Sequence, residues 1–598
     1  MKKRNDMKNI IFRIIPGAVC LFWLACGCDF LEPKLSGTYN DENYTDYPQM
    51  VRGLVEHAYN LRPRTYASIR FAASDALADN AVFRSESNAN RLFSLGSVTL
   101  GNSPFESVWT NNYTAIYYCN QFLKDDLGMT THYYLDAESD NLLRRCLQGD
   151  AYGLRAWYHF SLLKHFGGKG TDGVLYGVPL MTEAVKISEA DPAKLTRATF
   201  DDTVMQILDD CDKAYEYLPY LNRDYSGNTN TSIPVTGSIR YTTLDQVSID
   251  GLRAMVYLLW ASPAFNPSGD KTGYQKAAEY AMKVIRHKLE VEGPMGFDRT
   301  KSFSWRDGNS PEAIFPSSTY STTNYETTFY PIGFGGTADY VPTQELVDAF
   351  PMANGYPITD ARSGYDPAHP YVGRDARFYA DILYNGAEVL RDGNGSLMYT
   401  IESAEGGKDA PMLTGTSRTS YYIKKFLYSG WNPFDSNVLS NVSVVFFERW
   451  EQMCLIFAEA ASAFLGSAEN DSFGYSPKEV LGWVRSRPTA EGKPGITADP
   501  YLDECAASPA LFQALVRNEW RITTCFEGTR YFDLRRWGEE INVPVHGMAI
   551  TPSGEDAFSY QKTLLETKHY PSPWMPIPVG DIRRCPNLVQ NEGWENWR

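Results

Sequence analysis

The sequence predicts a mainly α-helical fold of tetratricopeptide-like repeats with a large, irregular, loop-rich region set between them. Residues 248–287 and 447–488 each read as a helix, a short polar turn and a second helix. Each pair spans about the ~34 residues that a helical hairpin of this repeat needs. Residues 288–445 are instead rich in Gly, Pro, Ser, Thr, Tyr and Asn and mostly lose helical periodicity.

The first residues predict an exported, lipid-anchored protein. A basic start is followed by the apolar run "IIPGAVCLFWLA", which is typical of a secretory signal and too short to span a membrane stably. The run ends in "ACGCDFLE", which resembles a bacterial lipobox. Cys28 is the expected lipidated residue, Cys26 is the alternative, and a plain cleaved signal is the simpler possibility. Residues 1–27 are therefore the predicted lipoprotein signal peptide and 28–598 a single domain.

The helical segments follow from apolar spacing. In residues 143–168, Leu147, Ala151 and Leu154 recur at helical intervals, and the segment closes on two glycines, which is a signal for a helix C-terminus. We place the helical scaffold at about residues 45–287 and 446–540.

The middle of the chain is predicted to be irregular. Residues 319–342 read mostly as loop, and 421–435 start like a short strand. No shift in composition marks a linker around 288–445. This region is therefore expected to pack on the helical scaffold as its ligand-binding face.

The segment "FEGTRYFDLRRWGE", residues 526–539, carries six charged side chains among its aromatics. One helix is expected to end at Glu527–Gly528 and another to begin near Thr529. Arg530 and Asp533, three positions apart, are able to meet. No His, Ser or Cys nucleophile accompanies them, and the neighbouring arginines would keep both carboxylates ionised. A satisfied ion-pair network that supports the fold is favoured over a catalytic pair.

Charge and cysteine usage exclude several classes of protein. The formal net charge is −16, and loss of residues 1–27, with five basic groups and one acid, brings it to −20. Nucleic acid and anionic membrane surfaces are therefore unsuitable partners. Of ten cysteines, three belong to the signal, and the other seven are scattered without a C-x-x-C pair, so we predict buried free thiols.

Eight segments in order resemble the SusD/RagB family of outer-membrane lipoproteins. The hallmark is "VRNEWRITTCFEGTRYFDLRRWGE". The other matches include "CDFLE", "VWTNNYTAIYYCNQFL", "DAYGLRAWYHFSLLKHFGG", "LRAMVYLLWASPAFNP", "VPTQELVDAFPMANGYPI" and the closing "PWMPIPVGDIRRCPNLVQNEGW". "NEWR" stands where the family often has a glutamate–arginine run, a small departure that affects no function.

The resemblance implies a SusD-like fold in which tetratricopeptide-like repeats support a loop-rich ligand face. It implies a cell-surface lipoprotein of the outer membrane that captures glycan for a SusC-like TonB-dependent transporter and is not an enzyme. Three alternatives stay open: a peptide or glycoprotein-fragment binder of the RagB type on the same scaffold, a helical polysaccharide hydrolase or lyase, and a structural tetratricopeptide adaptor.

Sugar capture needs exposed aromatic faces with polar side chains beside them. In the family, polar residues of an early segment meet aromatics that follow the central repeats. The loop aromatics and the polar residues of "SDALADNAVFR" supply the candidates: Trp305, Tyr320, Tyr325, Tyr330, Trp431, Asp79, Asn80 and Arg84.

No cofactor is expected. The histidines are scattered without an H-E-x-x-H motif, and no metal site is predicted. "NPSGDKTGY", residues 266–274, has oxygen-rich residues that could hold Ca²⁺, but its spacing does not match an EF-hand and a solvated turn is the simpler interpretation. "GFGGTA", residues 333–338, lacks the strand and helix of a dinucleotide loop and is predicted to be a turn.

Overall fold

The computed structural model describes residues 44–68, 71–97, 103–222, 240–294, 296–391, 394–411, 416–435, 441–554 and 557–596. The chain divides into two compact units, residues 1–51 and 52–598, and the second carries nearly all of the described elements. The predicted signal peptide and both candidate anchor cysteines lie outside the described residues. Within the described part, no helix combines the length and the apolar character that a membrane crossing requires.

Helices dominate the fold, as predicted. The α-helices are α3 (Pro48–Asn60), α4 (Ala72–Asp75), α5 (Ala89–Ser94), α6 (Glu106–Leu123), α7 (Leu127–Thr130), α8 (Ala137–Phe166), α9 (Phe200–Tyr217), α10 (Gln246–Ala261), α11 (Thr272–Arg286), α12 (Asn324–Phe329), α13 (Gln344–Ala349), α14 (Ala376–Asp381), α15 (Trp450–Leu465), α16 (Pro477–Ser486), α17 (Pro500–Ala506), α18 (Pro509–Thr523), α19 (Arg530–Trp537) and α20 (Val579–Arg584). Shorter helical turns are η1 (Tyr44–Asp46), η2 (Lys124–Asp126), η3 (Ile187–Glu189), the π-helix η5 (His287–Glu292) and η6 (Ile332–Phe334).

The strands are short and pair two by two. They are β1 (Ala81–Phe83), β2 (Gly168–Lys169), β3 (Leu175–Tyr176), β4 (Ala313–Pro316), β5 (Tyr320–Thr322), β6 (Tyr340–Pro342), β7 (Ile382–Leu383), β8 (Glu388–Arg391), β9 (Leu397–Thr400), β10 (Tyr422–Ile423), β11 (Asn441–Ser443), β12 (Phe446–Arg449), β13 (Pro544–Gly554) and β14 (Ala557–Thr567). The antiparallel pairs among the described strands are β1–β6, β2–β3, β4–β12, β5–β11, β7–β10, β8–β9 and β13–β14.

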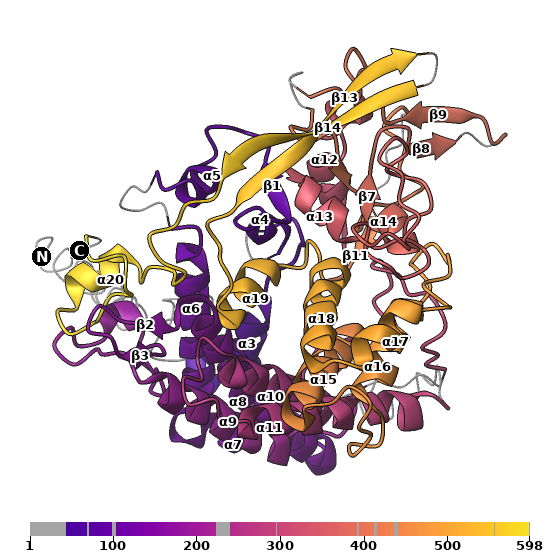
Figure 1. Cartoon of the computed structure of the whole chain (residues 1–598). Coiled ribbons are helices and arrows are strands. Elements are labelled where there is room, and N and C mark those ends of the chain that lie inside the picture. Colours follow the sequence, from indigo (N-terminus) through magenta and orange to yellow (C-terminus); the bar gives the residue numbers. More distant parts are fainter. Residues whose placement is uncertain are drawn as a thin grey trace, which may run out of the picture. The chain divides into compact units, whose positions relative to one another are not determined.

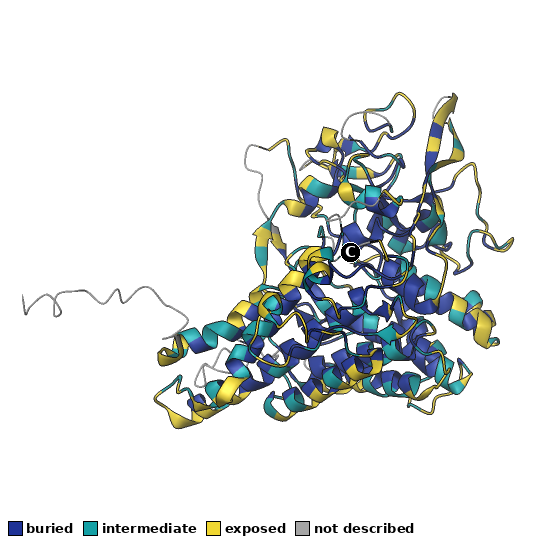
Figure 2. Cartoon of the chain, turned by 90° about the vertical axis from the view of Figure 1, so that its left-hand side faces the viewer, coloured by how far each residue is buried: buried dark blue, intermediate teal, exposed yellow. Residues whose placement is uncertain are grey.

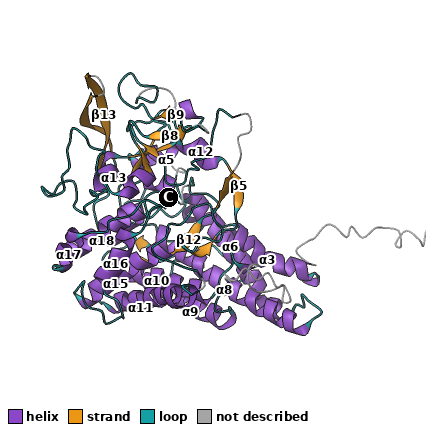
Figure 3. Cartoon of the chain, turned by 90° about the vertical axis from the view of Figure 1, so that its right-hand side faces the viewer, coloured by secondary structure: helices purple, strands orange, loops and turns teal. Residues whose placement is uncertain are grey.

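Successive helices pack against one another in the order that the repeat prediction requires. Helix α6 packs on α8, α8 on α9, α10 on α11, α11 on α15, and α15 on α16 and α18. Within the second unit, α8–α11 and α15 lie together at one end, and the hairpins β8–β9 and β13–β14 extend from the other (Figures 1 and 3). The scaffold therefore leaves the loop-rich segments on the side away from α9 and α11.

Local sequence sets the ends of the helices. Helix α8 begins after Asp136, whose carboxylate accepts the N–H of Ser139 at 2.8 Å, and it ends at Gly167. A Cβ on Gly167 would lie 2.6 Å from the carbonyl oxygen of Leu163, so glycine is required there. Helix α16 starts with Ser476 as N-cap and Pro477 in the first turn, a common start for a helix.

Two hydrophobic clusters are seen among the described residues of the second unit. One is formed mainly by α10, α11, α15, α16 and α18, with Ala277, Ala281 and Ala461 at close helix contacts. The other lies in the irregular region and contains Phe334, Tyr399 and other aromatics. Buried residues accordingly run through both the helices and the loops beside them (Figure 2).

Two details differ from the prediction. The helix expected from residue 447 begins only at Trp450, because Phe446–Arg449 form strand β12 and pair with β4 of the irregular region. Residues 319–342 were expected to be mostly loop, but they contain β5, α12 and β6. In both cases the strand partner lies far away in the sequence, where local periodicity gives no signal. The short strand expected near residue 421 is β10.

Candidate functional site

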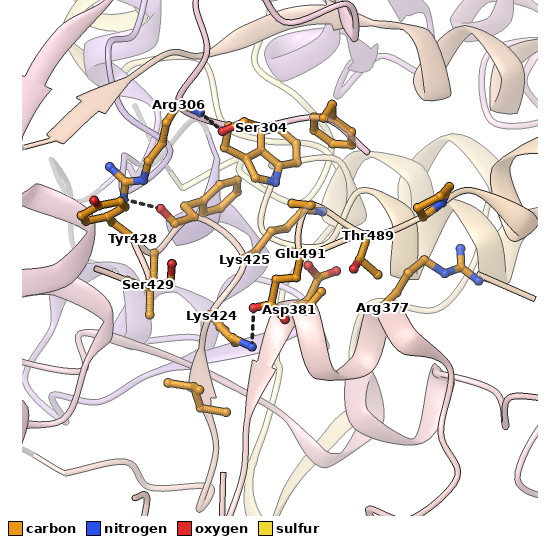
Figure 4. A pocket seen from close by; sticks show the side chains of 18 of the residues that line it. Ser304, Arg306, Arg377, Asp381, Lys424, Lys425, Tyr428, Ser429, Thr489 and Glu491 are labelled. Atoms are coloured by element: carbon orange, nitrogen blue, oxygen red, sulfur yellow. Dashed lines mark hydrogen bonds and ion pairs between the residues drawn. The ribbon is translucent and has the colours of Figure 1, made fainter. Parts of the chain in front are cut away.

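The loop-rich region encloses a cavity of about 580 Å³, within the range usual for ligand sites (Figure 4). It lies where the segments 303–306, 377–389, 424–429 and 484–491 meet. Its lining mixes aromatic and polar side chains: Phe303, Ser304, Trp305, Arg306, Tyr330, Arg377, Asp381, Leu383, Glu388, Lys424, Lys425, Phe426, Tyr428, Ser429, Glu451, Arg487, Thr489 and Glu491 among them. We therefore take it as the candidate ligand site.

One side of the cavity carries a cation beside an exposed aromatic ring. The guanidinium of Arg306 bonds the carboxylate of Glu326 and the carbonyl of Phe426, and its centre lies 5.4 Å from the ring centroid of Tyr428. The backbone N–H of Tyr428 also donates to Glu326, at 3.0 Å. Glu326 is fully buried, whereas Tyr428 is 37% exposed. This buried carboxylate thus fixes a cation and an aromatic face at the cavity edge.

A second ion pair lies on another side of the cavity. The ammonium of Lys424 contacts a carboxylate oxygen of Glu491 at 2.7 Å and donates to the carbonyl of Tyr379 at 2.8 Å. Glu491 is exposed and Lys424 is partly buried. Both polar heads therefore lie at the cavity, close to solvent (Figure 4).

Trp305, which the sequence singled out, lines the cavity as a nearly buried ring. Only 7% of it is exposed. Its ring lies between 5.2 and 5.5 Å from the rings of Tyr66, Phe426 and Phe446, centroid to centroid. The cationic groups of Lys425 and Arg449 lie 5.4 and 5.5 Å from its centroid. Trp305 is thus held rigidly by packing and by two cations.

Glu527, from the segment whose charges were interpreted as scaffold, holds both of those cations. Its carboxylate accepts from Arg449 at 2.7 and 2.8 Å and from Lys425 at 2.9 Å. It follows helix α18 in a tight turn in which Phe526 and Gly528 have φ values of 64° and 77°. The N–H of Phe526 donates to Asp75 at 2.6 Å, which fixes the turn. These contacts give Glu527 a structural role beneath the cavity.

The predicted pair of Arg530 with Asp533 is wrong. Arg530 instead donates to Asp79 at 2.7 and 2.9 Å, and Asp533 accepts from Arg536 at 2.8 Å. Arg536 also pairs with Glu459. Most charges of this segment are therefore paired, Arg530 with Asp79 on another part of the chain and Asp533 with Arg536 on the same helix.

Asp381, at the end of α14, stands out among the cavity residues. It is 9% exposed, and its carboxylate accepts from the thiol of Cys525 at 3.6 Å. Burial raises its pKa to about 6, although the nearby Lys425 acts in the opposite direction. Within the described chain it has no ion pair shorter than 4.0 Å, so this carboxylate keeps most of its hydrogen-bonding capacity.

The candidate aromatics are mostly packed rather than exposed. Tyr325 and Tyr330 are 1% and 4% exposed, and Trp431 is 5% exposed and stacks on Tyr330 with a centroid distance of 5.4 Å. Tyr320 is partly buried. The expectation that loop position leaves these rings open is wrong, because the loops form their own hydrophobic cluster. The structure brings Trp305 and Tyr330 to the same cavity, and a ligand role for all five rings stays a prediction.

The polar candidates of the early segment do not line the cavity. Asp79 lies between Arg521 and Arg530. Burial would raise its pKa, but these two guanidinium groups hold it well below the usual value. Asn80 is 1% exposed and bonds Asp75 and Arg521. Their ligand roles stay untested, but these side chains already have strong internal partners.

Arg84 is partly buried and lies 3.7 Å from Asp339. It too is absent from the cavity lining, and its ligand role likewise stays a prediction.

Sequence reasoning missed several cavity residues: Arg306, Asp381, Lys424, Tyr428 and Glu491. Arg306 and Tyr428 have a signal in retrospect, since they stand in the same loop segments as Trp305 and Trp431. Asp381 and Glu491 have none, because each reaches the cavity only through tertiary contacts.

The weaker motifs have local structural roles. The carboxylate of Asp270 in the oxygen-rich loop accepts the N–H and hydroxyl of Thr272, before helix α11. Among the described residues, no group of three His, Cys, Asp or Glu side chains is placed to hold a metal ion. The segment 333–338 forms the end of η6 and a turn at Gly335. The seven described cysteines are buried and free, as predicted.

Comparison with known proteins identifies the architecture. Residues 311–594 match the model of the SusD family, and residues 29–231 match a SusD-like model described as starch-binding and associating with outer membrane. A SusD-like protein from Bacteroides fragilis superimposes with a TM-score of 0.68 at 23% identity, covering 93% of this chain and 98% of its own. A SusD-like carbohydrate-binding protein from the same species gives 0.67 at 19% identity, covering 92% and 100%.

A SusD homologue from Bacteroides thetaiotaomicron gives a TM-score of 0.58 at 20% identity, covering 92% of this chain and 99% of its own. No curated protein sequence matches the chain. The structural likeness, at these identities, establishes a shared fold. The two family models extend that agreement over most of the sequence, including the hallmark segment that holds Glu527, and the chain therefore belongs to the SusD family.

Proposed function

We propose that this protein captures oligosaccharide or polysaccharide at the cell surface and passes it to a SusC-like TonB-dependent transporter of the outer membrane. Residues 29–231 match a family model described as starch-binding and associating with outer membrane. A solved protein of the same fold is named carbohydrate-binding. The observation that carries the proposal is the cavity itself. It offers an exposed tyrosine ring beside paired cations and carboxylates, a combination suited to the apolar faces and hydroxyl groups of a sugar.

The ion pairs of the hallmark segment favour ligand binding without catalytic turnover. The carboxylates in the hallmark segment are held in ion pairs, and Glu527 sits between two cations. A carboxylate whose oxygens are held by two cations is not free to transfer a proton to a substrate. We therefore infer a binding protein and not an enzyme. We further propose that a lipid on Cys28, or on Cys26 as the alternative, anchors the protein.

The test is calorimetry of the full-length protein in mild detergent against a panel of plant, host and microbial oligosaccharides. We expect binding to one glycan class, weakened about tenfold by Tyr428→Ala, because an aromatic contact is worth roughly 1–1.5 kcal/mol. Tyr220→Ala, which removes a 49% exposed ring outside the cavity, is the matched control. Binding to none of the sugars, or equal losses in both variants, would contradict the proposal.

Delivery to a transporter needs a second measurement. Purification of the tagged protein from outer membranes should recover a TonB-dependent barrel in stoichiometric amount. Recovery of the protein alone from membranes that contain such barrels would contradict this part of the proposal.

A further inference from the structure

The cations that line the candidate cavity are already neutralised. Among the described residues, every Lys and Arg in its lining has a carboxylate partner: Arg306 with Glu326, Arg377 with Asp375 and Glu519, Lys424 with Glu491, Lys425 with Glu527, and Arg487 with Glu312. An anionic ligand would have to displace one of these carboxylates. Most of the pairs are buried, where removal of one partner is strongly unfavourable.

One carboxylate in the lining, Asp381, uses only part of its hydrogen-bonding capacity. Asp381 accepts only the thiol of Cys525 in the described chain, and a thiol is a weak donor. The neighbouring ammonium of Lys425 is engaged by the carbonyls of Thr523 and Cys525, at 2.8 and 3.1 Å, as well as by Glu527. Asp381 thus lines the cavity with free acceptor capacity and without a strong donor (Figure 4).

This pattern selects a ligand that brings hydrogen-bond donors and no negative charge. Sugar hydroxyl groups are such donors, and bonds to an ionised carboxylate are stronger than bonds between neutral groups. A uronate or sulfate would meet the carboxylate of Asp381 without a free cation among the described lining residues to offset the repulsion. Resting on the proposed function, we propose that the cavity takes an uncharged glycan and that Asp381 is the residue that binds its hydroxyl groups.

The protonation of Asp381 supplies an independent readout. Burial raises its pKa to about 6, Lys425 and Arg377 lower it, and Glu527 raises it, while the Cys525 thiol bonds the charged form. The carboxylate is therefore ionised above pH 6 and becomes protonated below it. Glycan affinity should fall as the pH decreases from 7.5 to 5, with a midpoint near 6.

The first experiment compares ligands. The full-length protein in mild detergent is titrated at pH 7.5 with neutral hexa- or heptasaccharides of glucose, mannose and xylose and with oligogalacturonate, alginate and hyaluronan fragments of similar length. We expect binding among the neutral set. If the binder is a glucose or mannose oligosaccharide, its C6-oxidised form should bind at least tenfold more weakly. Tightest binding to an anionic fragment would overturn the inference while leaving glycan capture intact.

The second experiment removes the acceptor charge. Asp381→Asn should weaken the neutral binder about 10- to 100-fold, the equivalent of one or two hydrogen bonds to a charged group. Asp209→Asn, an exposed carboxylate paired with Lys213 on α9, is the control and should change affinity less than twofold. Thermal unfolding of both variants establishes that they are folded.

The outcomes separate the two proposals. Glycan binding that survives Asp381→Asn and has no midpoint near pH 6 would refute the role of Asp381 and keep the capture function. If the wild-type protein binds none of the oligosaccharides in the panel, both the capture function and this inference are refuted. The pH profile needs no variant, so it decides the question even if Asp381→Asn fails to fold.

Discussion

Replacing Glu527 by glutamine tests whether the charge of the hallmark segment builds the fold. Glu527 accepts from Arg449 and Lys425, whose side chains are 1% and 4% exposed. Loss of one partner of a buried ion pair typically costs about 3–5 kcal/mol. Here Arg449 keeps Glu312 and Glu451, Lys425 keeps two carbonyls, and the glutamine oxygen still accepts one bond. We therefore expect Glu527→Gln to lower the free energy of unfolding by about 3 kcal/mol, the lower end of this range.

The assay is urea unfolding of the full-length protein in mild detergent at pH 7.5, followed by tryptophan fluorescence, with the midpoint and slope compared between variants. Glu539→Gln is the matched control from the same segment. Glu539 pairs with Arg517 at the surface, with 45% of its side chain exposed, and its loss should cost no more than about 0.5 kcal/mol. If both substitutions change stability equally, the structural reasoning fails. If Glu527→Gln is as stable as wild type and abolishes cleavage of a polysaccharide, Glu527 is catalytic.

Two further predictions concern the irregular region and its support. Glu448 is fully buried without a hydrogen-bond partner for its carboxyl oxygens among the described residues, and burial followed by repulsion from Asp245 and Asp250 raises its pKa well above 4.5. At pH values above 4.5 the Glu448 carboxyl therefore stays protonated in the folded chain but releases its proton in the unfolded chain. As the pH rises above 4.5, wild type should therefore lose stability relative to Glu448→Gln by about 1.4 kcal/mol per pH unit until the pH reaches the raised pKa of the folded state, and parallel stability profiles would contradict this. A Cβ on Gly336 would lie 2.1 Å from the carbonyl oxygen of Tyr330, so Gly336→Ala should destabilise the chain by about 1–3 kcal/mol in urea unfolding and weaken glycan binding, whereas Gly580→Ala, in open space, should do neither.

The helical scaffold could be predicted because its signals are local. Apolar spacing in residues 143–168 and the glycines after it locate most of α8 and its end, although Asp136 extends the helix toward the N-terminus. The hallmark turn at Glu527 and the following helix α19 were also placed correctly. In these cases the signal for the helix or its end, such as apolar spacing or a glycine, lies within the segment itself.

The site could be predicted only in part because its contacts are long-range. Trp305, which was predicted to contact a ligand, lines the candidate cavity, but its burial depends on Tyr66, Phe426 and Phe446, which are far away in the sequence. Asp79 meets Arg530 across 451 positions. No local pattern distinguishes a loop aromatic that is open to solvent from one that packs against another loop.

Glu527 links the hallmark segment of the family fold to the candidate cavity. The hallmark segment holds Arg449 and Lys425, and these two cations flank the Trp305 ring beside the cavity. The remaining lining comes from loops, notably 424–429 and 487–491. Lys425 and Arg487 in these loops belong to the ion-pair network beneath the cavity, so we infer that the ligand can be altered without disturbing the network only by changes at the other loop positions. The hallmark therefore marks the shared scaffold, and the residues proposed to contact the ligand, Asp381 at the end of α14 and Tyr428 in a loop, lie outside it.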